Sequence, residues 1–319
     1  MSEHAQSILE PSPVRKMGKT KVVLNRIWRH RGAYLLVLPG FIYFLIYKYV
    51  PMLGLIVAFQ DFNPFQGMLK SEFVGFAQFR KIFAEDEVIR VLWNTLQISF
   101  LQIVFAFPLA IILSLMLNEV RNQAYKRVVQ SIVYLPHFLS WVVVVGIFFM
   151  LLKSDGLINN ALKAMGFEPI GFMTTPALFK PLITFQVIWK ETGWGTIIFL
   201  AALAGVNPQL YEAAVMDGAN RWRQIWHITL PAIRSTIVIL LILRLGHVMD
   251  VGFEQIYLML NSFVREVGEV LDTYVYEKGI RQADVSFATA VGLFKGVVGL
   301  VLVVTANRLA KRFGEQGLY

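Results

Sequence analysis

The chain has 319 residues, of which 56% are apolar and 16% are charged, and its formal net charge is +9. A mean hydropathy of +0.57 exceeds what a soluble globular domain needs and indicates a membrane protein. Cysteine is absent, which excludes disulfides, thiolate metal sites and a cysteine nucleophile, and the five histidines lack a metal-binding spacing. We therefore expect no catalytic residue and no metal site.

The first 32 residues form a polar, basic tail before the first apolar run. We expect residues 1–20 to be disordered and residues 21–31, which place Trp28 among basic side chains, to lie at an anionic membrane surface. Gly18-Lys19-Thr20 matches only the end of a phosphate-binding loop, because Pro13 stands where the first glycine belongs and no strand precedes it. The chain is therefore expected to bind no nucleotide.

Six apolar segments are long enough to cross a bilayer, which takes about 20 residues. The second and third contain no formal charge, whereas the others include ionisable residues such as Lys48. The first segment begins too late and runs too long for a cleavable signal peptide, so we expect it to be retained. Gly292, Gly296 and Gly299 are expected to let the last span pack closely on another helix. The predicted spans are 33–59, 91–118, 128–152, 181–205, 232–251 and 287–307.

Basic residues are distributed unevenly between the segments that join these spans. Segments 1–32, 118–127, 206–234 and 308–319 contain 16 basic and 6 acidic residues, whereas 60–91, 153–180 and 252–286 contain 10 basic and 13 acidic. Because lysine and arginine are retained on the cytoplasmic side, both termini and the segment 206–231 are predicted to be cytoplasmic. The positive net charge is thus a topology signal, and we expect no nucleic-acid partner.

The segment 206–231 is predicted to form a helical hairpin between the fourth and fifth spans. Asn207 can cap a helix that Pro208 opens and that runs to Asp217. Gly218 suits the left-handed conformation that ends a helix, and a second short helix over residues 220–229 leads to Pro231, where the next span begins. One face of the first helix presents Leu210, Ala213, Ala214 and Asp217, and its two alanines allow a partner to approach closely.

Seven positions in this hairpin have a fixed spacing: Glu212, Ala213 and Ala214, then Gly218, then Ile228, Leu230 and Pro231. This pattern resembles the cytoplasmic coupling loop of permease subunits in ATP-binding-cassette (ABC) importers. The resemblance implies that Glu212, Ala213, Ala214, Asp217, Gly218, Ile228, Leu230 and Pro231 couple this chain to an ATPase.

Further sequences extend the resemblance to residues 26–312. Trp93-Asn94-Thr95, Gly156-Leu157-Ile158-Asn159 and Trp189 with Gly193 look like permeases of the carbohydrate-uptake family. The run from Trp28-Arg29-His30-Arg31 to Leu38-Pro39-Gly40, with Tyr49-Val50-Pro51-Met52 and Ala58-Phe59-Gln60-Asp61-Phe62, is similar to the branch that imports complex oligosaccharides and is often paired with a lipid-anchored binding protein.

This resemblance implies an all-α, polytopic protein of the type I ABC importer permease fold, with six transmembrane helices and both termini cytoplasmic. Its parts would be a cytoplasmic tail (1–32), a transmembrane permease domain (33–307) with its coupling loop (206–231), and a C-terminal tail (308–319). The chain would lie in the bacterial cytoplasmic membrane and move a sugar, an oligosaccharide above all, by alternating access. It would itself not be an enzyme.

The implied partners are a second homologous permease subunit, an ABC ATPase dimer, and an extracellular or periplasmic solute-binding protein. ATP and magnesium would be bound by the ATPase subunits, and no cofactor by this chain. The sequence has no internal repeat that would let one chain form both halves of the pathway. The long polar segment 252–286 is expected to contact the docked binding protein.

Ionisable residues at membrane depth normally face a cavity or an opposite charge, because facing lipid is costly. Arg244, Asp250 and Lys295 are therefore candidates for the substrate pathway, together with Lys190 and Glu191. The alternative for each is an ion pair between helices. Trp189, Trp194 and Phe253 are candidates for stacking on sugar rings, although aromatic side chains near span ends also anchor helices at the interface.

Other functions remain as alternatives. The same fold could import a non-sugar solute such as an amino acid or a peptide. A secondary transporter would need an ion relay and inverted repeats, which the sequence lacks. A membrane enzyme would need a nucleophile or a metal constellation, and neither pattern is present.

Overall fold

The computed structural model describes residues 28–315, 317 and 318, so the expectations for residues 1–27 lie outside it. The chain separates into two compact units, the first ending at Leu55 and the second beginning at Ile56. Within the described residues, six helical segments are long and apolar enough to cross a membrane, which confirms the predicted number of spans. They are Arg31–Phe59, Asp86–Glu119, Trp141–Ala164, Pro176–Ala204, Arg221–Gly246 and Val285–Arg312.

The described part of the first unit is helical. Helix α2 (Arg31–Phe44) continues through a π-helical turn at Leu45–Tyr49 into α3 (Val50–Met52). Its side chains up to Leu53 are all exposed within this chain, although most of them are apolar. Such a surface is stable only where lipid or another chain covers it.

The second unit opens with a small hairpin and then enters the second span. This span begins at Asp86 and Glu87, whose negative charges interact favourably with the positive end of the helix dipole. The span passes from α5 to α6 through a π-helical turn at Gln102–Ala106. The elements are a 3-10 turn (Leu53–Phe59), β1 (Gln60–Asp61) paired antiparallel with β2 (Glu72–Phe73), α4 (Ala77–Ala84), α5 (Asp86–Leu101) and α6 (Phe107–Glu119).

The predicted third span, 128–152, is not one helix. Helix α7 (Gln123–Tyr134) ends in a 3-10 turn at Leu135–Phe138, and α8 (Trp141–Leu152) begins anew after Ser140 caps it. Pro136 cannot donate a backbone hydrogen bond, which favours the break. The membrane-spanning candidate therefore starts at Trp141 and extends through α9 (Leu157–Ala164).

The fourth and fifth spans enclose the hairpin that the sequence predicted. The fifth span ends earlier than expected, because α13 ends at Gly246 and leaves Asp250 in the loop beyond it. The helix from Arg221 to Gly246 is continuous and includes one π-helical turn at Ile225–Thr229. The elements are α10 (Pro176–Ala204), α11 (Pro208–Met216), α12 (Arg221–Gln224) and α13 (Leu230–Gly246).

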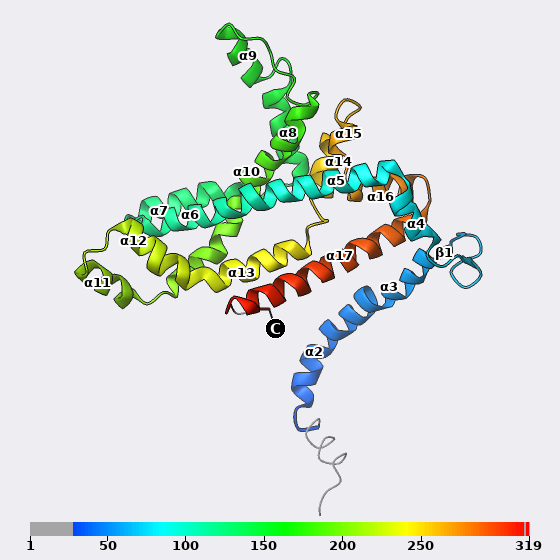
Figure 1. The fold of residues 1–319 in the computed structure, drawn as a ribbon, viewed down its shortest axis with the longest axis horizontal. Helices are drawn as coiled ribbons and strands as arrows, with labels where there is room; N and C mark the ends of the chain where they lie inside the picture. Colours follow the sequence, from blue (N-terminus) through cyan, green and yellow to red (C-terminus); the bar gives the residue numbers. More distant parts are fainter. Residues whose placement is uncertain (1–27, 316, 319) are drawn as a thin grey trace, which may run out of the picture. The chain divides into compact units, whose positions relative to one another are not determined.

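The segment 252–286, predicted as a long polar segment on the outer side, is folded into short helices and contains fully buried residues. Gln255 and Leu271 are fully buried, and Tyr274 is 2% exposed. Within the second unit, Figure 1 shows α14 and α16 at the end opposite to α11. The elements are α14 (Phe253–Met259), α15 (Arg265–Gly268), α16 (Leu271–Val275), a π-helical stretch (Tyr276–Arg281) and the last span, α17 (Val285–Arg312).

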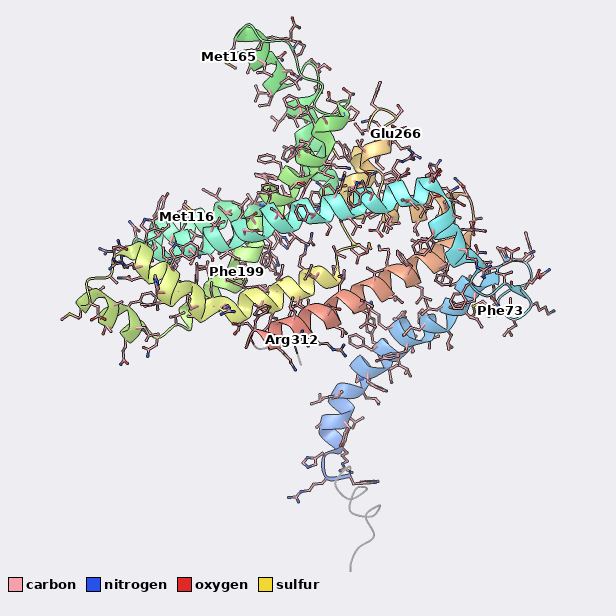
Figure 2. The ribbon with its side chains drawn as sticks, viewed as in Figure 1. Phe73, Met116, Met165, Phe199, Glu266 and Arg312 are labelled. Atoms are coloured by element: carbon pink, nitrogen blue, oxygen red, sulfur yellow. The ribbon has the colours of Figure 1, made fainter. Side chains whose placement is uncertain are left out.

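Three apolar clusters hold the second unit together. One joins α5, α16 and α17, a second joins α5, α10, α14 and α15, and a third joins α6, α10 and α13. Phe199, labelled in Figure 2, belongs to the third cluster and is 2% exposed, whereas Met116 on α6 is 64% exposed. In the most apolar 18-residue stretch of each span, at most 28% of the residues are buried within this chain. Much apolar surface is thus left for lipid and partner chains.

Helices α13 and α17 approach so closely that glycine is required at their contact. A Cβ added to Gly299 would lie 2.5 Å from the carbonyl oxygen of Gly246, which is backbone and cannot move aside. The prediction of close packing is therefore confirmed for Gly299. A Cβ at Gly292 or Gly296 would meet nothing within 4 Å, so these two glycines are not needed for contact within this chain.

Substituting Gly299→Val should separate α13 from α17 and lower stability, because overpacking a close helix contact costs about 1–3 kcal/mol. The melting temperature and the yield of monodisperse protein in detergent measure the effect. Gly296→Val, three residues away on the same helix but in open space, serves as the matched control. Equal melting temperatures for the two variants would contradict the close contact.

Candidate functional site

The hairpin between the fourth and fifth spans forms as its sequence predicts. The Asn207 side chain accepts a hydrogen bond from the backbone N–H of Gln209 at 3.0 Å and caps α11, which Pro208 opens. Gly218 has φ +76° directly after α11, in the left-handed region that favours glycine. A sharp turn therefore follows α11.

Side-chain contacts fix the two arms of this hairpin to each other. The Tyr211 hydroxyl lies 3.0 Å from Thr229 Oγ1, and Gln224 Nε2 donates to the carbonyl oxygen of Ala219 at 3.0 Å. Arg221 pairs with Glu119 on α6 at 3.6 Å. These contacts were not predicted from the sequence. A glutamine beside a tight turn is the pattern that could have indicated Gln224.

The predicted coupling residues lie on an exposed surface of the hairpin. Glu212, Ala213, Asp217, Gly218 and Pro231 are exposed, and Ala214, Ile228 and Leu230 are half-buried. Glu212 forms no ion pair among the described residues. Large apolar side chains are exposed around them: Leu210, Val215, Met216, Trp222 and Trp226. An exposed patch of this composition is typical of a surface that a partner covers.

A cavity of about 460 Å³ lies between α6, α10 and α13. Its wall is mostly apolar and includes few polar groups, as in ligand-binding pockets generally. Arg244 is one of these groups, and its Nη2 donates a hydrogen bond to Gln102 Oε1. The other polar side chains of the wall are Glu191, Thr192, Trp194 and His247.

Glu191 is the carboxylate of this cavity, and it is already paired. His137 Nδ1 lies 2.8 Å from Glu191 Oε2, and Lys190 Nζ lies 3.4 Å from Oε1. Lys190 is buried and also donates to the carbonyl oxygen of His137 at 2.6 Å. The His137 ring stacks on Trp194 with centroids 4.4 Å apart. The break between α7 and α8 thus brings His137 against the cavity wall.

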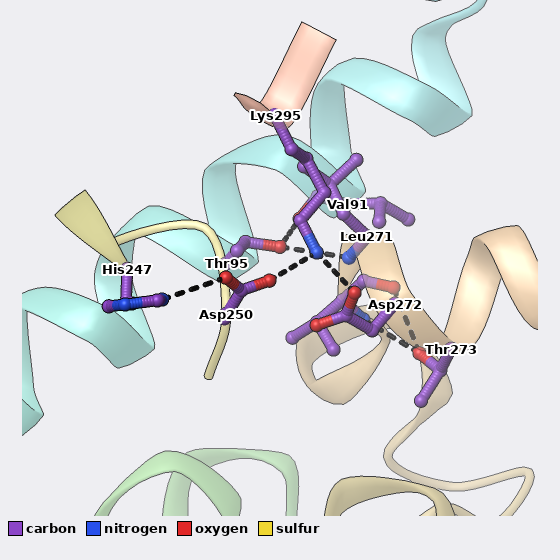
Figure 3. A network of polar contacts seen from close by, with 9 residues as sticks. Val91, Thr95, His247, Asp250, Leu271, Asp272, Thr273 and Lys295 are labelled. Atoms are coloured by element: carbon purple, nitrogen blue, oxygen red, sulfur yellow. Dashed lines mark hydrogen bonds and ion pairs between the residues drawn. The ribbon is translucent and has the colours of Figure 1, made fainter. Parts of the chain in front are cut away.

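Lys295 lies at the centre of a second polar network, drawn in Figure 3. Its Nζ pairs with Asp250 Oδ1 at 2.6 Å and with Asp272 Oδ1, and His247 Nδ1 lies 3.5 Å from Asp250. Burial alone would raise the pKa of Asp250, but the contacts with Lys295 and His247 outweigh it and hold that pKa below its ordinary value. Lys295 therefore forms ion pairs, which was the stated alternative to a place in the substrate pathway.

The structure brings together some of the predicted pathway residues and separates others. Arg244 and Trp194 line the same cavity, with Glu191 beside them. Trp189 does not line it but packs edge-on against Phe148, with centroids 5.8 Å apart. Phe253 lines a different cavity together with Asp272. Gln102, one of several amides in the uncharged span 91–118, was not among the predicted pathway residues, because these were all ionisable or aromatic.

A sequence model of the family described as "Binding-protein-dependent transport system inner membrane component" matches residues 106–315. The chain is 52% identical over 316 residues to the polygalacturonan/rhamnogalacturonan transport system permease protein YteP of Bacillus subtilis, covering 99% of this chain and 98% of that protein. It is 51% identical over 309 residues to protein LplB of the same organism, covering 97% of each.

Solved structures resemble the chain over most of its length. The crystal structure of a bacterial alginate ABC transporter, in complex with a periplasmic protein that binds an alginate pentasaccharide, contains a chain that superposes with a TM-score of 0.85. That chain is 42% identical in sequence, and the match covers 92% of this chain and 99% of that one. A second crystal structure, of a bacterial transporter that imports the acidic polysaccharide alginate, gives the same TM-score and identity.

Substituting Lys295→Met should destabilise the protein, because it leaves Asp272 without its ion pair and Asp250 with His247 alone. Asp250 is half-exposed, so the loss should lie below the ~3–5 kcal/mol of a fully buried pair. Arg281→Met is the matched control, since Arg281 pairs with Glu277 at an exposed position and such pairs contribute about 0–1 kcal/mol. Melting temperatures in detergent measure both effects.

The loss in Lys295→Met should shrink in acid. A carboxyl with a lowered pKa contributes stability above its unfolded pKa and loses it as the pH falls through the folded pKa. The difference between wild type and variant should therefore be largest near neutral pH. A difference that grows as the pH falls would contradict the ion-pair assignment of Asp250.

Proposed function

This chain belongs to the family of binding-protein-dependent transport system inner membrane components, and from that premise we propose which solute it moves and how. It is an inner-membrane permease subunit of an ABC importer for sugars. Alternating access moves the solute, and the ATP is bound and hydrolysed by partner subunits.

The proposed solute is an oligosaccharide that contains carboxylates. The relative at 52% identity and the solved structures at 42% identity are named for polygalacturonan/rhamnogalacturonan and for the acidic polysaccharide alginate, whereas relatives at 27–29% identity are named for arabinooligosaccharides, lactose and diacetylchitobiose. These names favour a carbohydrate over the amino acid or peptide that the sequence left open. They also favour a negatively charged one.

The observation that carries this proposal is the position of Arg244 in the cavity wall with no carboxylate of the described residues within ion-pair distance. Its hydrogen-bond partner is the neutral amide of Gln102, and within the described residues it forms no ion pair. Glu191, the carboxylate in the same wall, is paired with Lys190 and His137. A guanidinium retains its proton even when buried and binds carboxylates through two parallel hydrogen bonds. Arg244 is thus the group that a uronate carboxylate would meet.

The proposed coupling device is the hairpin over Glu212–Pro231. Its exposed apolar residues around Glu212 and Gly218 fit a partner surface, which we take to be the ATPase dimer that binds ATP and magnesium. The positive-inside distribution of charge supports a cytoplasmic location for this hairpin and both termini. A second permease completes the pathway, and a solute-binding protein delivers the sugar.

Substituting Gly218→Leu should abolish ATP-driven uptake and leave the amount of protein in the membrane normal. A Cβ at Gly218 meets nothing within 4 Å in this chain, so a larger side chain would collide only with a partner. The measurement is uptake of oligogalacturonate by proteoliposomes containing the permease pair, the ATPase and the loaded binding protein.

Gly166→Leu is the matched control, because Gly166 has φ +84° and equally open surroundings but lies on a segment separated from the hairpin by the fourth span. Both substitutions place leucine at a positive φ, so the backbone strain is the same in the two variants. Wild-type uptake by Gly218→Leu, or an equal loss in both variants, would contradict the coupling role.

Substituting Arg244→Gln should slow uptake of an acidic oligosaccharide by about tenfold to a hundredfold, because a hydrogen bond to a charged group contributes about 1.5–3 kcal/mol. Uptake of a neutral oligosaccharide of equal length should change less, which makes the ratio of the two rates the decisive quantity.

Arg234→Gln controls for loss of a positive charge on the same helix, since Arg234 pairs with Glu315 away from the cavity. Proteoliposomes with the assembled complex give both rates. If Arg244→Gln fails to assemble, or slows both sugars equally, Arg244 has a structural role and does not select the substrate.

A further inference from the structure

We propose that a second cavity, between α14, the π-helical stretch Tyr276–Arg281 and α17, is a subsite that binds one sugar ring of the transported oligosaccharide by aromatic stacking. This inference rests on the proposed sugar transport and extends it. The cavity measures about 500 Å³. It is lined by Phe253, Asp272, Val275, Tyr276, Val285 and Thr289, among others.

Three aromatic rings form one platform: Phe253 and Tyr276 line this cavity, and Tyr257 packs against both of them. The rings of Phe253 and Tyr257 lie one turn apart on α14, nearly parallel, with centroids 5.4 Å apart. Tyr276 approaches both of them, with centroids 5.4 Å from Phe253 and 5.2 Å from Tyr257. Phe253 is 36% exposed and Tyr257 is 43% exposed. The rings therefore pack on each other and still present surface on which a flat ligand can stack.

The opposite face of α14 packs against α10 and holds this aromatic platform in place. Gln255, on the opposite face of α14, is fully buried and donates hydrogen bonds at 2.8 Å to the carbonyl oxygen of Ile183 and to Gln186 Oε1, both on α10. Ile256 and Met259 of α14 belong to an apolar cluster with α10. A binding surface that is already rigid loses little entropy when a ligand binds.

The polar groups at this cavity suit the hydroxyls of a sugar. Asp272 lines the cavity and contacts Lys295 through Oδ1, so its Oδ2 is left to accept a hydrogen bond. The Tyr276 hydroxyl has no hydrogen-bond partner among the described residues. Aromatic faces beside a carboxylate and a hydroxyl match the alternating apolar and hydroxyl surfaces of a pyranose. A lipid tail would offer no hydrogen bond to Asp272 Oδ2 or to the Tyr276 hydroxyl.

The two cavities are joined by a continuous set of contacts. Asp272 pairs with Lys295, Lys295 with Asp250, and Asp250 contacts His247, which lines the cavity of Arg244 (Figure 3). The segment 252–286 is separated from the Glu212–Pro231 hairpin by the fifth span, so it lies on the other face of the membrane. An oligosaccharide that enters from that face would meet the aromatic subsite before it reaches Arg244.

The test compares two lengths of one sugar polymer. Proteoliposomes with the complete transporter are supplied with digalacturonate or tetragalacturonate at saturating binding protein, and initial uptake rates are measured. Tyr276→Leu and Phe253→Leu remove one ring each and should lower the ratio of the tetramer rate to the dimer rate by about tenfold, equivalent to about 1.4 kcal/mol. Tyr257→Phe removes a hydroxyl alone and should lower the ratio less.

Phe263→Leu is the control, because Phe263 is an exposed aromatic residue of the same segment that does not line the cavity. Its ratio should equal that of the wild type. The subsite is refuted if the platform variants leave the ratio unchanged, slow both oligomers equally, or respond to bilayer thickness and not to oligomer length. The last result would identify these rings as membrane anchors.

A second measurement keeps the site testable if the leucine variants do not fold. Tyr276→Trp retains an aromatic face, and its added fluorescence should be quenched by tetragalacturonate with a concentration dependence that the wild type lacks. If the wild type imports neither oligomer, the proposed function fails, and this fluorescence alone decides whether the cavity binds the sugar. No quenching at saturating tetramer would overturn the subsite.

Discussion

A charged side chain at membrane depth needs a partner within the protein, because the bilayer interior offers no water to solvate it. Lys295 obeys this constraint by binding two aspartates from different segments, which fixes α17 to the loop after α13 and to α16. Lys180 on α10 does so by donating to Asn94 and Gln97 on α5. These contacts determine which helices are neighbours, since apolar faces alone would pack in many registers.

Arg244 stands apart from this pattern. Its partner is a neutral amide and its cavity is open, whereas the charged side chains around Glu191 neutralise one another. A protein that has compensated its other charges in this region gains nothing in stability from leaving one guanidinium with a neutral partner. The cost is understandable where a solute supplies the missing carboxylate, and this connects the electrostatics of the cavity with the acidic polysaccharides named for similar transporters.

Local signals were sufficient for part of the structure. Apolar length gave the six spans, and the Asn207 cap with Gly218 gave the bounds of α11 within one residue, because capping and left-handed glycine act over a few residues. Charge content misled the prediction for the third span, since an uncharged run hid the break at Pro136. The polar composition of 252–286 likewise gave no sign that Gln255 and Tyr274 are buried, because their burial depends on distant helices. The contact between Arg244 and Gln102 joins residues 142 positions apart, and no local pattern contains it.

The position of Arg244 on its helix relates the cavity to the hairpin. The helix from Arg221 to Gly246 is continuous, so at 1.5 Å per residue it extends for about 39 Å as one rod. One end is fixed to the rest of the hairpin through Gln224, which bonds to Ala219, and Thr229, which contacts Tyr211; the other end carries Arg244 and leads to the Lys295 network. Gly299 holds the rod against α17. A rod constrained in this way cannot absorb a displacement of the hairpin by bending locally, because packed helices shift as units. Under the proposed coupling, movement at the hairpin would reach the guanidinium and the ion pairs beside it, which are the groups proposed to hold or release a charged sugar.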